Sequence, residues 1–205
     1  MRTKTITLIT VAVLLTGPAN AGVISFIDED IAIPTDYAGV SVDLETGNTS
    51  VSLDGLDQTG DLNFVFGGLG FSNDADANAD SPSWQPVRVG TGNTDVLRNL
   101  GVGVQVAPNS TYSSGFGGST NNLTEFNAGE KGYVGFFLVL DDGNDTVANG
   151  WMEVTFQNND VPGVIHSWAY DDTGAPLAVG AIPEPTQGVM LLLGLTAAAM
   201  RRRRS

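Results

Sequence analysis

Tyr133-Val134-Gly135-Phe136-Phe137-Leu138-Val139-Leu140 is apolar at every position, and this stretch decides the fold. Side chains of an extended chain alternate between its two faces. A run without polar residues at either parity therefore predicts a strand that is covered on both sides. Asp141-Asp142-Gly143-Asn144-Asp145 follows at once and supplies a charged turn, which protects such a strand from aggregation. We expect a β-rich body built around this strand.

Shorter segments on both sides alternate apolar residues with polar or small ones, the period-two pattern of half-buried strands. They span residues 23–27, 39–44, 49–53, 62–66, 85–89, 100–107, 150–157, 164–170 and 176–179. Glu45-Thr46-Gly47-Asn48 has the composition of a hairpin turn. No stretch of the body shows helical periodicity. The pattern indicates an all-β, antiparallel β-sandwich of jelly-roll type. A parallel β-solenoid is the weaker alternative, because no fixed repeat recurs.

The amino-terminal residues 1–21 have the layout of a secretory signal peptide. Arg2 and Lys4 precede an apolar core at 6–15, and Ala19-Asn20-Ala21 has small residues at both cleavage-site positions. We expect cleavage after Ala21. The alternative is an uncleaved membrane anchor, but a core of about ten residues is short against the roughly 20 needed to span a bilayer.

The carboxyl-terminal residues 183–205 form a second membrane-directed segment. Pro183-Glu184-Pro185 breaks regular structure, because proline lacks an N–H and fixes φ. An apolar stretch at 188–200 follows, and we expect a transmembrane helix over 187–200. The chain then reads Arg201-Arg202-Arg203-Arg204-Ser205, and such a basic end marks the cytoplasmic side and stops transfer. A helix of about 20 Å is short for a hydrocarbon core of roughly 30 Å, which suits a temporary anchor.

This order of motif, apolar segment and basic terminus resembles the PEP-CTERM sorting signal of Gram-negative bacteria. In that family the membrane protease exosortase recognises and processes the signal. The resemblance implies an exported protein, held transiently in the inner membrane and then delivered to the cell surface or extracellular matrix. Gly150-Trp151, the aromatic stretch 165–171 and Gly174-Ala175-Pro176 are similar to strands that precede the signal in many members. That similarity covers residues 130–205 and implies a shared exported β module, without catalytic residues.

Residues 22–182 lie between the two segments and are enough chain for one domain with a sizeable core. All 23 acidic residues lie between Asp28 and Glu184, where Arg88, Arg98 and Lys131 are the only basic residues. This charge argues against nucleic acid as a partner, because its backbone is bound through cationic contacts. The chain has no cysteine, which excludes disulfides, thiol catalysis and cysteine-ligated zinc.

Catalytic and metal-binding patterns are sparse. His166, the only histidine, could act as an acid or base with Asp171 or Glu153, although a structural role on its strand is favoured. The sequence has no Gly-x-Ser-x-Gly elbow and no phosphate-binding fingerprint. Oxygen ligands at every second position could bind Ca²⁺. They are Asp74, Asp76, Asn78 and Asp80, with the loop 141–145 as a second candidate. A solvated acidic loop is the alternative for both, and we expect no other cofactor.

Aromatic residues could provide a carbohydrate-binding platform, or they could form the core. The candidates are Trp84, Trp151, Trp168, Tyr112 and Tyr170. A glycoside hydrolase would need two facing carboxylates, which so acidic a chain can bring together by chance. We expect an exported, noncatalytic surface or matrix protein associated with exopolysaccharide or biofilm. A carbohydrate- or Ca²⁺-binding module is the alternative, and a hydrolase is third.

Overall fold

The computed structural model describes residues 22–51, 60–72, 84–90, 95–112 and 125–182. Three sets of predictions lie outside the described residues. They are the signal peptide with Ala19 and Ala21, the loop of Asp74, Asp76, Asn78 and Asp80, and the segment 183–205 with Pro183, Glu184, Pro185, Arg201, Arg202, Arg203 and Arg204. Among the described residues, no helix is long and apolar enough to cross a membrane.

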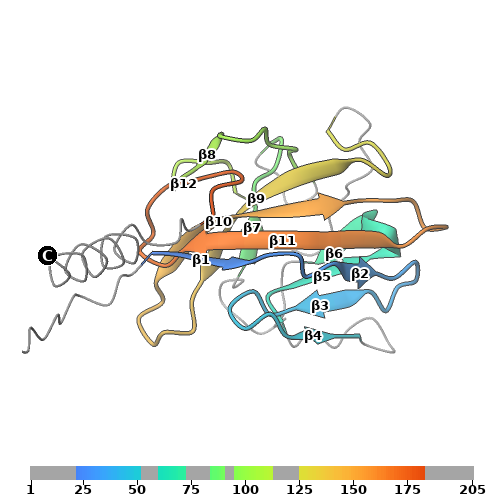
Figure 1. Ribbon diagram of the computed structural model, residues 1–205, viewed down its shortest axis with the longest axis horizontal. Coiled ribbons are helices and arrows are strands. Elements are labelled where there is room, and N and C mark those ends of the chain that lie inside the picture. Colours follow the sequence, from blue (N-terminus) through green and yellow to red (C-terminus); the bar gives the residue numbers. More distant parts are fainter. Residues whose placement is uncertain (1–21, 52–59, 73–83, 91–94, 113–124, 183–205) are drawn as a thin grey trace, which may run out of the picture.

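The largest sheet has six strands in the order β1-β11-β10-β9-β7, and β2 pairs with β11 beside this path (Figure 1). Its strands are β1 (Val23–Phe26), β2 (Ile31–Ile33), β7 (Trp84–Pro86), β9 (Lys131–Val139), β10 (Val147–Thr155) and β11 (Gly163–Asp171). All of its pairings are antiparallel. The three nine-residue strands β9, β10 and β11 are consecutive in the chain and adjacent in the sheet, so short hairpin loops suffice to join them.

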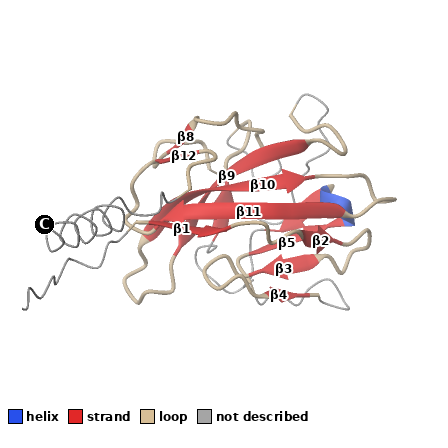
Figure 2. Ribbon diagram, viewed as in Figure 1, coloured by secondary structure: helices blue, strands red, loops and turns tan. Residues whose placement is uncertain are grey.

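A four-stranded antiparallel sheet has the order β4-β3-β5-β6. It consists of β3 (Val40–Val42), β4 (Thr49–Ser50), β5 (Leu62–Val65) and β6 (Gly70–Ser72). A two-stranded sheet pairs β8 (Gln105–Val106) with β12 (Leu177–Ala178). A single turn of 3₁₀-helix, η1 (Phe66–Gly68), is the only helical element in the described ranges (Figure 2).

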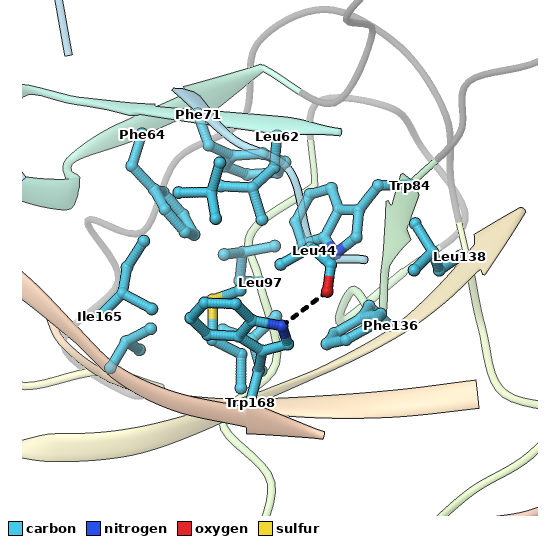
Figure 3. Close-up of a cluster of buried hydrophobic side chains, with 14 of the residues drawn as sticks. Leu44, Leu62, Phe64, Phe71, Trp84, Leu97, Phe136, Leu138, Ile165 and Trp168 are labelled. Atoms are coloured by element: carbon cyan, nitrogen blue, oxygen red, sulfur yellow. Dashed lines mark hydrogen bonds between the residues drawn. The ribbon is translucent and has the colours of Figure 1, made fainter. Parts of the chain in front are cut away.

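The main hydrophobic core joins the six-stranded and the four-stranded sheet. Phe64 of β5 packs edge-on against Trp84 of β7, with 6.5 Å between their ring centroids. Trp168 of β11 is fully buried, stacks on Phe26 at 4.7 Å, and donates a hydrogen bond from Nε1 to the Leu44 carbonyl at 2.9 Å (Figure 3). One aromatic side chain of the six-stranded sheet thus contacts the turn that follows β3 of the four-stranded sheet.

A second hydrophobic cluster lies on the opposite face of the six-stranded sheet, under β8 and β12. Its buried members are Val87, Val106, Trp151, Ala169, Leu177 and Val179. Gly135 of β9 makes room for this layer, because a Cβ there would come within 2.6 Å of Leu100 Cδ1 and 2.9 Å of Val106 Cγ2. The six-stranded sheet is therefore covered on both faces.

The all-β, antiparallel architecture predicted from the sequence is confirmed, and the parallel solenoid is excluded for the described strands. The apolar stretch 133–140 corresponds to β9, which pairs with β10 and β7. The hairpin turn at 45–48 joins β3 to β4, with Asp43 N donating to Asn48 O at 2.9 Å.

One predicted strand is largely wrong, and two strands were missed. Of the segment 100–107, only Gln105–Val106 is a strand, because Gly103 takes a φ of +84° and turns the chain. Ile31–Ile33 and Gly70–Ser72 are strands that were not predicted, because three residues are too short to show an alternation.

Candidate functional site

One cavity lined by described residues lies at the hairpin of β3 and β4. Asp43 organises the turn between them, since its Oδ1 accepts hydrogen bonds from the backbone N–H groups of Glu45 at 3.0 Å and Thr46 at 2.9 Å. In such a turn the aspartate side chain stabilises the chain reversal through hydrogen bonds to nearby backbone N–H groups, without apolar contacts. It brings the polar residues that follow the turn back beside those of β3.

The cavity, which we call the polar hollow, has a volume of about 240 Å³. Its lining residues are Ser41, Asp43, Asn48, Thr49, Ser50 and Gly60. None of them has an apolar side chain. Ser41 Oγ accepts a hydrogen bond from Gly60 N at 3.1 Å. A Cβ at Gly60 would lie 2.5 Å from the backbone carbonyl of Val42, so only glycine fits at this approach.

A row of polar residues crosses the four-stranded sheet at the hollow. Ser50, Ser41 and Asn63 are successive Cα partners on β4, β3 and β5. The neighbouring residues Val42 and Phe64 belong to the main core. Ser41 and Asn63 are themselves buried, and Asn63 Nδ2 has no hydrogen-bond partner in the described part of the chain. The sheet thus has one apolar face and one polar face, and the polar face includes the buried side chains of Ser41 and Asn63.

Asp43 is the one carboxylate that lines the hollow, and Asp61 and Glu45 lie within two residues of lining residues in the chain. Asp61 Oδ2 accepts a hydrogen bond from Leu44 N at 2.8 Å. Burial, and then the like charges of Asp141, Asp43 and Asp142, raise the pKa of Glu45 despite a hydrogen bond from the Asp141 backbone. The basic groups of the described residues make their contacts elsewhere: Arg88 with Asp95 O, Arg98 with Val89 O and Lys131 with Glu153. The electrostatic potential at the hollow is therefore negative.

His166 forms a separate polar cluster on β11. The register of β10 and β11 shifts between Glu153 and Val154, which leaves His166 without a partner residue at a β-bulge. Its Nε2 lies 2.9 Å from Thr155 Oγ1, and its Nδ1 lies 2.7 Å from Asp30 Oδ1. Hydroxyl, imidazole and carboxylate follow in the order that nucleophilic triads use.

This cluster nevertheless fits a structural role. A neutral imidazole can donate to Asp30 and accept from the Thr155 hydroxyl, and a protonated one can donate to both. Neither Thr155 nor His166 lines the polar hollow. The partners expected from the sequence are wrong, because Glu153 contacts Lys131 and Tyr133, and Asp171 bonds within its own turn to Thr173. The cluster fastens the loop between β1 and β2 to the bulge.

The interpretation of the aromatic residues as an exposed platform is wrong. Trp84, Trp151, Trp168 and Tyr170 are buried, and Tyr112 is partly buried with its hydroxyl 3.0 Å from Ala107 O and 3.1 Å from Asn149 Oδ1. The large aromatic side chains fill the two cores, which removes them from any binding surface.

The buried tyrosines predict a loss of stability in alkali. Burial, followed by the nearby carboxylate charges, raises the pKa of Tyr170 to about 12. The unfolded value is near 10, so this stabilisation is complete below pH 10 and is lost as the pH rises from about 10 to 12. We expect the free energy of unfolding, measured in urea, to fall by about 1–3 kcal/mol over that window. Tyr170→Phe should reduce the fall, whereas Val102→Ala, at an exposed position without a titratable group, should not. An equal alkaline fall in all three proteins would contradict the assignment.

The acidic loop 141–145 is organised by its own hydrogen bonds. Asp142 accepts from Asn144 N at 2.8 Å and from the Thr146 hydroxyl. The bond from Thr146 is the main cause of the lowered pKa of Asp142. Across the described ranges, no group of three acidic, histidine or cysteine side chains is placed to hold a metal ion. The second calcium candidate therefore has the geometry of a turn.

The hollow was not predicted from the sequence. Ser41 and Asp43 lie in the predicted strand 39–44, and Thr49 and Ser50 lie in the predicted strand 49–53. Asn48 belongs to the predicted turn, and Gly60 lies outside the predicted segments. One pattern in the sequence could have indicated them: in three of the strands, hydroxyl and amide side chains are concentrated at every second position and therefore on one face. Comparisons of the chain with protein-family models, curated proteins and solved structures find no match.

Proposed function

We propose that this protein is an exported, noncatalytic component of the cell surface or extracellular matrix, sorted by a PEP-CTERM-type signal at 183–205. One observation carries the proposal: both ends of the described body lie near each other. Gly22 N donates to Asp172 Oδ1 at 2.6 Å, and Ala181 O accepts from Trp151 Nε1 at 3.0 Å. Trp151 and Ser25 are both partners of Ala169, so the two ends lie over the same part of the sheet (Figure 1).

This geometry suits a body that is tethered at one end. Before cleavage after Ala21, both membrane-directed segments would join the β-sandwich at the same side. After cleavage the carboxyl-terminal segment alone would tether the body, and the rest of the acidic surface would extend away from the anionic lipid that repels it. A compact jelly-roll body stabilised by packing alone, without disulfides, would keep its fold on either side of the membrane. Exosortase would be the processing partner, and exopolysaccharide the surrounding material.

The alternative function, a carbohydrate- or Ca²⁺-binding module, has one favourable observation, the polar hollow beside β3 and β4. It does not compete with the proposal, because a sorted surface protein can also bind a ligand. The glycoside hydrolase interpretation has no such support, since no facing pair of carboxylates lines the hollow.

Membrane fractionation of cells that make the protein tests the sorting proposal. Replacing Pro183 and Pro185 with alanine should let the following helix extend backward and conceal the processing site, because proline alone enforces an extended entry. Full-length protein should then accumulate in the inner membrane. Replacing residues 201–204 with glutamine removes the charge that holds the segment in place, about 2.5–3.5 kcal/mol per arginine at the bilayer centre. Unanchored protein should then leak into the medium.

Lysine at 201–204 is the matched control, since it keeps the charge and should sort like the wild type. An antibody against the body follows all variants in the same fractions. If wild type, the alanine variant and the glutamine variant reach the surface in equal amounts, the carboxyl-terminal segment is not a sorting signal and the proposal is wrong.

A further inference from the structure

We infer that the polar hollow binds one ring of a polyhydroxylated ligand that bears a primary ammonium group, the chemistry of an amino sugar. This inference concerns the body alone and does not depend on where the protein is sorted. It is carried by the size of the hollow, by its lining and by the sign of the charge around it.

The lining is matched to hydroxyl groups. Ser41, Thr49 and Ser50 are hydroxyl residues, Asn48 has an amide, and Asp43 has a carboxylate. Hydroxyls and amides both donate and accept, as sugar hydroxyls do, and a carboxylate accepts two strong hydrogen bonds. With no apolar side chain in the lining, the hollow offers little to an apolar ligand. A volume of about 240 Å³ is below the roughly 300–1,000 Å³ of pockets that enclose drug-sized ligands, which favours a single ring.

The charge selects a cationic ligand. Asp43 lines the hollow, Asp61 follows the lining residue Gly60 in the chain, and the described basic residues are engaged elsewhere. Asp43 uses Oδ1 for the turn, and no hydrogen bond within the described residues occupies its Oδ2. An ammonium group near this oxygen would gain a charge-assisted hydrogen bond, and a uronate would be repelled.

An inorganic cation fits less well. Hard cations such as Ca²⁺ require several oxygen ligands, usually more than one carboxylate. The lining contains a single carboxylate, and the described residues contain no group of three metal-binding side chains. The hydroxyl groups of the lining can all form hydrogen bonds only with a ligand that has hydroxyl groups of its own.

Titration of the full chain in a nonionic detergent without a sugar head group tests this inference. Glucosamine, glucose, glucuronate and methylammonium are added at equal ionic strength, and the backbone amides of residues 41–50 are followed by ¹⁵N NMR. We expect glucosamine to bind at least about fivefold more tightly than glucose, since an ion pair near 4 Å in water is worth that factor. Glucuronate should bind more weakly than glucose, and methylammonium should give no saturable shift.

Two variants separate the charge from the hydroxyl contacts. Asp43→Asn keeps an oxygen for the Glu45 and Thr46 amides, so the turn should persist while the ratio of glucosamine to glucose affinity falls to near one. Asn48→Ala combined with Thr49→Val should weaken glucosamine binding about tenfold. Asn127→Ala, an exposed amide whose contact is with Glu130, is the matched control and should bind like the wild type. Equal shifts with methylammonium, an unchanged ratio in Asp43→Asn, or no shift at 41–50 with any sugar would each overturn the inference.

Discussion

Trp168→Ala is expected to lower the free energy of unfolding by about 3–5 kcal/mol, the range for removing a large aromatic side chain from a core. Trp168 is fully buried, stacks on Phe26 and hydrogen-bonds to Leu44 O. Its removal leaves a cavity between the six-stranded and the four-stranded sheet and leaves a buried carbonyl unpaired. Urea unfolding followed by circular dichroism measures the loss.

One further variant separates the packing contribution of Trp168 from its hydrogen bond, and a second is a control at an exposed position. Trp168→Phe keeps most of the packing and removes the hydrogen bond, so we expect a loss of about 1–3 kcal/mol from the unsatisfied Leu44 carbonyl. Val102→Ala, at a position that is 72% exposed, should change stability by less than about 0.5 kcal/mol. A loss below about 1 kcal/mol for Trp168→Ala would mean that Trp168 does not connect the two sheets.

The long strands could be predicted from the sequence because each has enough residues to show its pattern. β9, β10 and β11 extend over nine residues each, and their predicted ends lie within three residues of the observed ones. β2 and β6 have three residues each and were missed. The segment 100–107 was misassigned because Val102 and Val104 mimic an alternation, whereas Gly101 and Gly103 support a turn, with Val104 N donating to Gly101 O.

The candidate site could not be predicted, because it depends on which strands become neighbours. Ser41 and Asn63 are brought together by the pairing of β3 with β5, and a shift of one residue would place them on the apolar face. Asp30 reaches His166 across 136 positions of sequence. Periodicity assigns a residue to one face of a strand, but it does not give the register of the neighbouring strand. It therefore cannot predict which side chains of different strands become neighbours in a sheet.

The second large effect is expected for Phe136 on β9 and its partner Gly150 on β10. Phe136 is fully buried, and its ring occupies the space over Gly150, where a Cβ would lie 2.5 Å from Phe136 Cε2 and Cζ. Phe136→Ala should lower the free energy of unfolding by about 3–5 kcal/mol. Gly150→Ala should cost about 1–3 kcal/mol, because the added methyl group displaces the ring.

The double variant tests whether the ring and the glycine act as a unit. When the ring is absent, the methyl group of Ala at 150 meets only the Ala169 carbonyl oxygen, at 2.7 Å, among the three closest atoms. The double variant should therefore be more stable than the sum of the single losses predicts, by about 1–2 kcal/mol. Additivity within about 0.5 kcal/mol would instead locate the strain of Gly150→Ala at the backbone of β11. A glycine in a central strand usually weakens that strand. A double variant that is more stable than the sum of the single losses would show that the Phe136 ring on β9 compensates for this weakness by packing over Gly150 on β10.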